Sequence, residues 1–245
     1  MIWIYDTIIY NPLLNVFVYF YGILGDFGLT IIAVTGLIRI VLYPFFKKSA
    51  EQQVIMQRLQ PEMDELRKKY ADNREEQTKA MLELFQKHGA NPFSGFFLLL
   101  VVQLPILIAF YQIILHIFEG IDSERLYDGL VAPMLDPYFL GLINLNDKSI
   151  VMVLIAAAST LLLTITADSK NWHRLGTEFS KHATKWLIGP VLTFVFLQFF
   201  IPQAHNAIAI YWIATSFFSG IQQFLVNRQI DARGKDSAGH PVPQS

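Results

Sequence analysis

The stretch from Gly28 to Phe46 constrains the chain most, because it is an apolar run of membrane-spanning length with an arginine inside it. A helix needs about 20 mostly apolar residues to cross the hydrocarbon core of a bilayer. Arg39 lies within this run, and an arginine at that depth costs roughly 2.5–3.5 kcal/mol on insertion scales. Charged side chains retained at such a cost usually have a function, so Arg39 is the first candidate site residue.

The composition places the chain among membrane proteins. Of its 245 residues, 53% are hydrophobic and only 16% are charged, which is unlike an average soluble domain. The chain has no cysteine, which excludes disulfides, thiolate chemistry and zinc–thiolate sites. Its N-terminal segment lacks the basic region of a secretory signal, so we do not expect a cleaved signal peptide.

Five apolar runs are expected to cross the membrane as helices. They cover residues 28–46, 96–118, 150–167, 186–201 and 207–226. Polar residues and a glycine interrupt segment 1–27, and we interpret it as an amphipathic helix in the outer interface, with a sixth span as the alternative. The predicted fold is therefore all-α, with five transmembrane helices and an N-terminal interfacial helix.

Residues 47–93 change abruptly to a charged composition and predict a helical hairpin outside the membrane. Apolar residues recur at steps of three and four along both halves, as in amphipathic helices. Asp72 followed by Glu75 resembles a capping box that opens the second helix. The residues predicted to make the hairpin contacts are Met63, Leu66, Tyr70, Met81 and Phe85. Such stripes either pair the two helices with each other or receive a partner.

The distribution of Lys and Arg predicts an orientation. Nine of them lie in residues 47–93, four in 168–185 and three in 227–245, whereas 119–149 contains two and 1–27 none. The positive-inside rule therefore places the hairpin, the 168–185 loop and the C-terminus in the cytoplasm, and the N-terminus and the 119–149 loop outside. The polar tail at residues 227–245 is expected to be disordered.

Arg39 shares a helix face with Thr35 one turn earlier and Tyr43 one turn later. The five predicted spans contain no Asp or Glu, which favours a water-exposed cationic site over an internal ion pair. A structural arginine satisfied by backbone carbonyls or lipid phosphate is the alternative. Gln103 and Thr215 are, taken singly, more typical of helix–helix contacts, but together with Arg39 they are able to line a hydrated groove.

Motifs of enzymes are absent from the sequence. It contains no HExxH, no GxSxG, no phosphate-binding lysine loop and no pair of intramembrane aspartates, so we predict neither catalysis nor a cofactor. His116 has no second ligand at helical spacing, so we predict no metal site. The hairpin is balanced in charge and the tail has few basic residues, so nucleic acid is not expected as a main ligand.

Three stretches together resemble the YidC-type membrane protein insertases, the family that includes the Oxa and Alb proteins. The stretches are IRIVLYPFFKKSAEQQVIMQRLQPEMDELRKKY, NPFSGFFLLLVVQLPILIAFYQIIL and IYWIATSFFSGIQQFLVNRQI. They contain an arginine before a Tyr-Pro, an Asn-Pro-x-x-Gly turn, a Gln-x-Pro and a Gln-Gln pair, in that order. The resemblance implies five core spans, a cytoplasmic hairpin and a hydrophilic groove closed to the outside, in a bacterial plasma membrane.

The resemblance also implies the site. Its groove arginine corresponds to Arg39, the neighbouring threonine to Thr35, the groove glutamine to Gln103, and the aromatic contact positions to Tyr211 and Trp212. The implied partners are nascent membrane proteins and the lipid bilayer, together with a Sec-type translocon, the ribosome or the signal-recognition targeting machinery. The chain departs from many relatives in lacking a large extracytoplasmic domain, a lipobox cysteine and a long basic tail.

The predicted function is that of an insertase and chaperone, which moves the polar extracellular segment of a nascent membrane protein through the groove. A small solute transporter or channel with an anion site at Arg39 is the alternative. Transporters commonly have inverted repeats or paired ionisable groups, and the sequence shows neither. A purely structural subunit of a larger translocon is the third class, in which Arg39 has no functional role.

Overall fold

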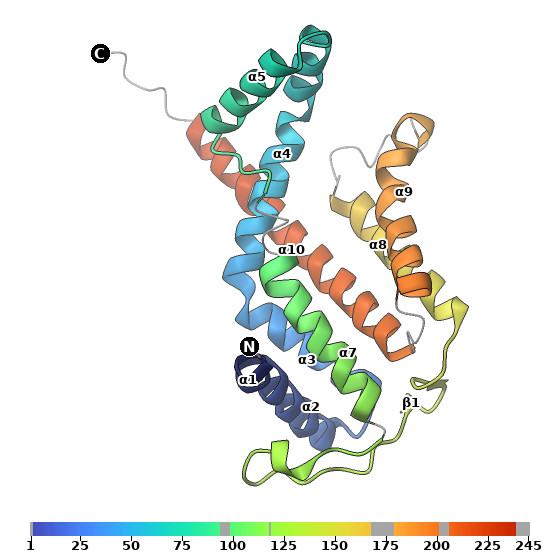
Figure 1. Ribbon diagram of the computed structural model, residues 1–245. Coiled ribbons are helices and arrows are strands. Elements are labelled where there is room, and N and C mark those ends of the chain that lie inside the picture. The colour runs from blue at the N-terminus through green and yellow to red at the C-terminus, as the bar shows by residue number, and fades with distance from the viewer. Residues whose placement is uncertain (1, 94–98, 118, 168–178, 201–205, 239–245) are drawn as a thin grey trace. The chain divides into compact units, whose positions relative to one another are not determined.

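The computed structural model of the protein describes residues 2–93, 99–117, 119–167, 179–200 and 206–238. These residues are mostly helical, and the strands among them form one short two-stranded sheet (Figure 1). The chain divides into two units. The first unit contains Met1–Val41 and Pro105–Ile221, and the second contains Leu42–Leu104 and Gln222–Ser245.

The first unit begins with a continuous helical stretch. It consists of α1 (Ile2–Tyr5), the π-helical turn η1 (Asp6–Tyr10) and α2 (Asn11–Leu24). Gly25 ends α2 at a φ of 64°, a left-handed conformation that glycine adopts without a Cβ clash. Asp26 then caps α3 (Phe27–Val41), because its Oδ1 accepts a hydrogen bond of 2.8 Å from the N–H of Leu29. This two-residue turn packs α2 against α3.

Aromatic residues of three helices form the centre of the first unit. The ring of Phe17 in α2 lies 5.8 Å from that of Phe27 in α3 and 4.9 Å, edge on, from that of Phe110 in α7 (Leu104–Ile117). All three side chains are fully buried. Edge-to-face and tilted arrangements are the favourable ones for aromatic pairs, so this cluster fixes how α2, α3 and α7 pack.

A π-helical turn, η2 (Leu99–Gln103), leads directly into α7. Pro105 is the second residue of α7 and has no N–H to donate to a carbonyl one turn earlier. A widened turn just before a proline accommodates that missing hydrogen bond. The sequence therefore explains why the helix changes its winding at this point.

The remaining helices follow the loop after α7. They are α8 (Ile150–Ala167), α9 (Phe179–Val195), the π-helical turn η5 (Phe196–Phe200) and α10 (Asn206–Ala238), which contributes residues to both units. The helices α8 and α9 lie side by side (Figure 1). Helix α8 has the bounds predicted for the third span, and large apolar side chains such as Leu154 and Leu162 are exposed on it. Exposed apolar faces of this kind suit contact with lipid.

Two helical stretches of the described residues are long and apolar enough to cross a membrane, namely Trp3–Leu24 and Asn206–Gln229. A third results if Phe27–Val41 and Tyr43–Met56 count as one broken span. Shorter apolar helices cover Val101–Ile117, Ile150–Ile165 and Leu187–Gln198. The count of five spans stays a prediction. The stretch at Trp3–Leu24 has the length of a span, so length does not separate the interfacial from the spanning interpretation.

The first predicted span, residues 28–46, is not one continuous helix. Helix α3 ends at Val41, and α4 (Tyr43–Lys69) begins after a turn at Leu42. Pro44 lies in the first turn of α4, where the missing N–H of a proline has no helical partner to lose. The Tyr-Pro pair is thus a helix start, and it shortens the apolar helix that carries Arg39.

The loop at residues 119–149 is held by side chains of α2. The loop contains the short helix η3 (Ser123–Arg125), and β1 (Tyr138–Phe139), which pairs antiparallel with β2 (Ile143–Asn144). Asn15 of α2 is only 3% exposed, and its Nδ2 donates to the carbonyl of Arg125 at 2.8 Å. Its Oδ1 accepts from the N–H of Tyr127 at 2.6 Å. One buried amide thus binds two backbone groups more than 100 residues away in sequence.

Three further contacts continue this attachment along the loop. The hydroxyl of Tyr21 accepts from the N–H of Asp136 at 2.8 Å, and Oδ2 of Asp26 accepts from the N–H of Leu140 at 2.6 Å. At the start of α10, Nδ2 of Asn206 donates to the carbonyl of Asn144 at 2.8 Å. These hydrogen bonds therefore attach the loop to α2, to the turn before α3 and to the start of α10.

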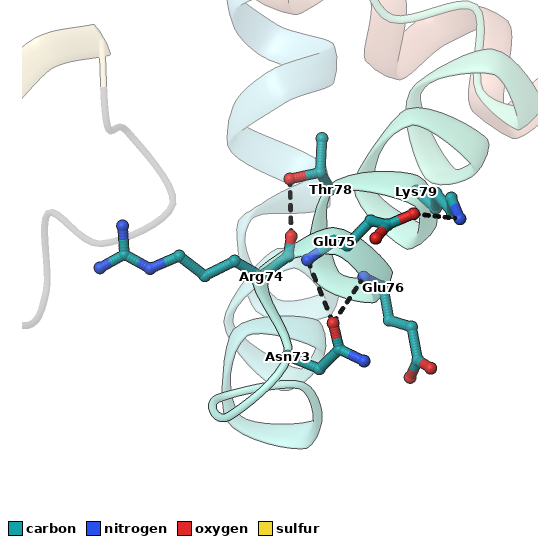
Figure 2. A network of polar contacts seen from close by, with 6 residues as sticks. All are labelled: Asn73, Arg74, Glu75, Glu76, Thr78 and Lys79. Carbon is teal, nitrogen blue, oxygen red and sulfur yellow. Dashed lines mark hydrogen bonds and ion pairs between the residues drawn. The ribbon is translucent and has the colours of Figure 1, made fainter.

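The second unit contains the predicted hairpin, formed by α4 and α5 (Arg74–Lys87). Asn73 is the N-cap of α5, and its Oδ1 accepts from the N–H groups of Glu75 and Glu76 at 3.2 Å each (Figure 2). The predicted capping box that begins at Asp72 is therefore wrong by one residue. Asparagine is as good an N-cap as aspartate, so the sequence pattern alone did not separate the two.

The prediction of a disordered tail from residue 227 is also corrected. Helix α10 continues through Ala238, twelve residues beyond the predicted end of the fifth span at residue 226. The residues after Val226 include Arg, Gln, Ala and Lys, which are good helix formers, and no proline follows before Pro241. Residues 239–245 lie outside the described part of the chain.

Candidate functional site

Arg39 lies in the last turn of α3, just before the break at Leu42, and its side chain is half-buried. The negative end of the helix dipole is at this end and stabilises a cation by about 0.3–1 kcal/mol. The early end of α3 therefore offsets part of the cost of placing an arginine among apolar residues. A helix that continued to Phe46 would have placed Arg39 away from its terminus.

Thr35 lies one turn before Arg39 and is 3% exposed. Its Oγ1 donates to the carbonyl of Ile31 at 2.6 Å, which uses the hydroxyl proton within α3. The lone pairs of the oxygen remain able to accept a hydrogen bond from another donor. Thr35 therefore contributes an acceptor to the polar face that also carries Arg39.

Helix α10 contributes Tyr211 to the surroundings of Arg39. Tyr211 is 3% exposed, and its phenol lies close enough to the guanidinium of Arg39 for an electrostatic interaction. Its ring packs on Phe110 with the centroids 4.4 Å apart. One turn later, Oγ1 of Thr215 is buried and has no hydrogen-bond partner among the described residues. A buried hydroxyl of that kind is costly unless a ligand or water satisfies it.

A close approach of two helices brings these groups together. A Cβ atom placed on Gly36 of α3 would lie 2.9 Å from Cζ of Phe218 in α10. Any side chain at position 36 would therefore push the two helices apart or displace the Phe218 ring. Tyr211, Thr215 and Phe218 are spaced four and three residues apart and so share one face of α10. That face is the one that meets α3 beside Arg39.

Trp212 belongs to a different contact, although it follows Tyr211 directly. Its Nε1 donates to Oγ1 of Thr160 in α8 at 3.2 Å, and its ring lies 5.8 Å from that of Phe196 in η5. Oγ1 of Thr193 in α9 also donates to Oγ1 of Thr160, at 3.3 Å. Trp212 thus joins α10 to α8 and α9, and its described contacts do not include Arg39.

Gln103, the other predicted groove residue, closes η2 and belongs to the second unit. Its place in the groove stays a prediction. Thr35, Arg39, Tyr211 and Thr215 all belong to the first unit, and their helices α3 and α10 meet there.

The hairpin residues form the contact between its two helices. Met63 of α4 is buried together with Leu59 and Leu84. Leu66, Met81 and Phe85 pack against that cluster and are half-buried. Tyr70 forms the C-cap of α4, and Nζ of Lys69 lies 5.2 Å from the centroid of its ring. Of the two roles considered for these apolar stripes, the described contacts are those of helix pairing.

Sequence reasoning missed the role of Asn15, which was noted only as an interruption of an apolar run. The signal that could have revealed it is its position on the apolar face of the helix, three residues before Val18 and next to Leu14, both of which are buried. A polar amide on an apolar face is normally hydrogen-bonded. The partner itself, more than 100 residues away, is not visible in any local pattern.

The side chains around Arg39 are suited to binding a polar ligand. A guanidinium, a phenol and two threonine hydroxyls provide several hydrogen-bond donors and acceptors within an otherwise apolar bundle. These four side chains include no carboxylate, imidazole or thiol to act as base or nucleophile at neutral pH. The set can hold a carboxylate, a phosphate or the backbone of an extended polar segment.

Comparison with known sequences decides the family. The sequence model of the family described as 60Kd inner membrane protein matches residues 19–233, most of the chain. The chain belongs to this YidC-type family. A relative named membrane protein insertase YidC 1, from Halalkalibacterium halodurans, is 33% identical over 91% of this chain and 79% of its own length. Membrane protein insertase MisCA of Bacillus subtilis is 30% identical over 98% of this chain and 83% of its own length.

Other YidC-type relatives are much longer. The membrane protein insertase YidC of Geobacter sulfurreducens is 29% identical over 90% of this chain, which spans only 37% of that relative. The resemblance inferred from the three sequence stretches is confirmed. The described helices and this family together establish an all-α membrane protein of the bacterial inner-membrane type.

Proposed function

We propose that the chain is a membrane protein insertase. It binds the polar extracellular segment of a nascent membrane protein near Arg39 and releases the apolar helix of that client along the first and fourth predicted spans into lipid. The names of its relatives support the general activity. The observation that carries the proposal is the polar set of Arg39, Tyr211 and Thr215 between α3 and α10, in an otherwise apolar bundle.

The physical argument concerns the barrier to moving polar groups across a bilayer. Each peptide-like group costs about 2–7 kcal/mol when it enters an apolar medium without a hydrogen bond. A hydrated groove that reaches part of the way across shortens the apolar path, so the barrier falls without a nucleotide. The guanidinium of Arg39 adds attraction for an acidic segment, and this attraction is stronger in a site of low dielectric than in water.

The orientation that suits this function follows from the basic residues. The hairpin and the C-terminus face the cytoplasm, where the ribosome delivers clients, and the loop at 119–149 faces outward. The partners we propose are nascent membrane proteins and the lipid bilayer. A Sec-type translocon, the ribosome and the signal-recognition targeting machinery are the further partners that the cytoplasmic hairpin would receive.

Insertion of a single-span client with an acidic N-terminal tail tests the proposal in bacterial cells depleted of their own insertase. Arg39→Ala should slow insertion by roughly 10- to 100-fold, because a charge-assisted hydrogen bond contributes about 1.5–3 kcal/mol. Arg39→Lys should retain most of the activity, and the exposed Arg228→Ala should retain all of it. Protection of the client tail from external protease is the readout. Unchanged insertion in Arg39→Ala would remove the arginine from the mechanism.

Two measurements separate this proposal from its rivals. The chain has no cysteine, so Arg39→Cys provides a single thiol at the site. Labelling by a membrane-impermeant reagent from the cytoplasmic side alone supports a groove closed to the outside, whereas no labelling from either side supports a purely structural arginine. Saturable flux of an anionic solute in liposomes, abolished by Arg39→Ala, would instead support the transporter.

A further inference from the structure

A second polar site lies in the first unit, away from the Arg39 site. It is a cavity of about 410 Å³ bounded by η1 and α2, by the last turns of α7 and by the start of the 119–149 loop. Its polar lining consists of Asp6, Tyr10, Gln112, His116, Asp122 and Arg125. A cavity of this size is in the range of small-ligand sites, and the proposed groove does not use it.

Arg125 is positioned to bind an anion in this cavity. Its guanidinium lies 5.2 Å from the centroid of the Tyr10 ring, and its Nε lies 3.7 Å from Oδ2 of Asp122. Both contacts restrain the guanidinium plane and leave its two terminal nitrogens without an acceptor among the described residues. Two parallel N–H donors of this kind match the oxygens of a phosphate.

The lining of the cavity also contains acceptor groups that suit a cation. The carboxylate of Asp6 is half-buried in the first turn of η1 and makes no ion pair with a described residue. Nδ1 of His116 lies 2.8 Å from the carbonyl of Gln112 and must carry a proton there, so its Nε2 is an acceptor when the ring is neutral. The hydroxyl of Tyr5 donates to Oε1 of Gln112 at 2.7 Å, which leaves the amide NH2 of Gln112 as a donor.

The charges of the lining select a class of ligand. Two carboxylates and one guanidinium suit a molecule that carries both a phosphate and an ammonium group with N–H donors. A purely anionic ligand would be repelled by Asp6, and a quaternary ammonium has no proton to donate to its carboxylate. The remaining lining is apolar, with Leu14, Ile113 and Ile117 among its residues.

The surroundings indicate that this ligand comes from the bilayer. Trp3 is 75% exposed and Ile8 67% exposed on the helical stretch that carries Asp6. Aromatic and apolar side chains in this arrangement are typical of the region where lipid headgroups meet acyl chains. We propose that the cavity binds the headgroup of an ethanolamine phospholipid, with its phosphate on Arg125 and its ammonium on Asp6.

Lipid binding by the full chain, purified in mild detergent and followed by native mass spectrometry, tests this site. The probes are phosphatidylethanolamine, phosphatidylcholine and phosphatidylglycerol with identical acyl chains. We expect phosphatidylethanolamine to bind about tenfold more tightly than the other two, the effect of one charge-assisted hydrogen bond. Asp6→Asn should abolish this preference, and Arg125→Gln should weaken binding of all three. Asp128→Asn, an exposed change in the same loop, is the matched control.

Several results would overturn the site. They are equal binding of the three lipids by the unmodified chain, a preference that survives Asp6→Asn, or a loss of preference in Asp128→Asn. Soluble phosphoethanolamine is the competitor that separates the two sources of this headgroup. Displacement by it at concentrations comparable to that of the lipid would overturn a membrane source. Asp6→Asn decides the matter alone if Arg125→Gln does not fold, because Arg125 also contacts Asp122.

Discussion

The amide of Asn15 provides the sharpest test of how the 119–149 loop is held. Its side chain is buried in α2 and donates to the carbonyls of Asn11 at 2.7 Å and Arg125 at 2.8 Å, while it accepts from the N–H of Tyr127 at 2.6 Å. Asn15→Ala removes all three bonds and leaves α2 otherwise unchanged, since alanine is a good helix former. The change therefore acts on the attachment of the loop.

The expected magnitude follows from the groups that lose their partner. A backbone group left without its hydrogen bond in a buried place costs about 1–3 kcal/mol. Asn15→Ala leaves two such groups, the carbonyl of Arg125 and the N–H of Tyr127. Both lie in an exposed loop and regain water easily, so the low end applies to each and the total is about 2 kcal/mol. The carbonyl of Asn11 stays within its helix and adds little.

Hydrogen exchange measured by mass spectrometry on the full chain in nanodiscs reports this local opening. A loss of about 2 kcal/mol corresponds to exchange roughly 30-fold faster in the peptide that contains Tyr127. Asn146→Ala is the matched control, because this exposed loop side chain makes no hydrogen bond with a described residue. An increase below about threefold in Asn15→Ala, or an equal increase in the control, would refute the attachment.

Three further predictions concern single contacts. Asn73→Ala should destabilise the first turn of α5 by about 1 kcal/mol, and Asp72→Ala should not, as measured by hydrogen exchange in the hairpin. Gly36→Val should lower the thermal stability of the purified chain, at a cost of about 1–3 kcal/mol, because its larger side chain has to displace Phe218 of α10; an unchanged melting temperature would contradict this packing. Trp212→Phe and Thr160→Val should each cost about 1 kcal/mol, and a double-mutant cycle should show that the two losses are not additive.

The hydrophobic pattern of the sequence predicted α8 and the two hairpin helices, because the formation of these helices depends on that pattern. The run at residues 150–167 lies between Lys148 and Asp168, and α8 has the same bounds because nothing within the run competes with helix. The charged hairpin was visible for the same reason, since its apolar residues recur at helical spacing. Arg39 and Thr35 were predicted from their spacing of one helical turn and again from the family resemblance, and both lie in α3.

The errors occurred where a single backbone group decides the structure. The break at Leu42 depends on Pro44 starting a helix rather than interrupting one, and both roles fit the sequence. The cap of α5 depends on which of two adjacent residues turns its side chain to the free N–H groups. Tyr211 and Trp212 were both inferred from the family resemblance, and their roles in the groove stay predictions. Adjacent residues on a helix point about 100° apart, and the described contacts of these two are with different helices.

The loop attachment and the Arg39 site lie at opposite ends of α3, and this arrangement bears on the proposed function. Asp26 binds the loop at the first turn, and Arg39 lies thirteen residues later, about 20 Å along a helix. A bilayer core is about 30 Å thick, so a polar segment that reaches Arg39 has part of that distance left. In the proposed function, the site beside α10 receives the client, and the loop bound by Asp26 orders the opposite end of α3. The proposal requires the outer end to stay closed, because an opening at both ends would let ions pass as well.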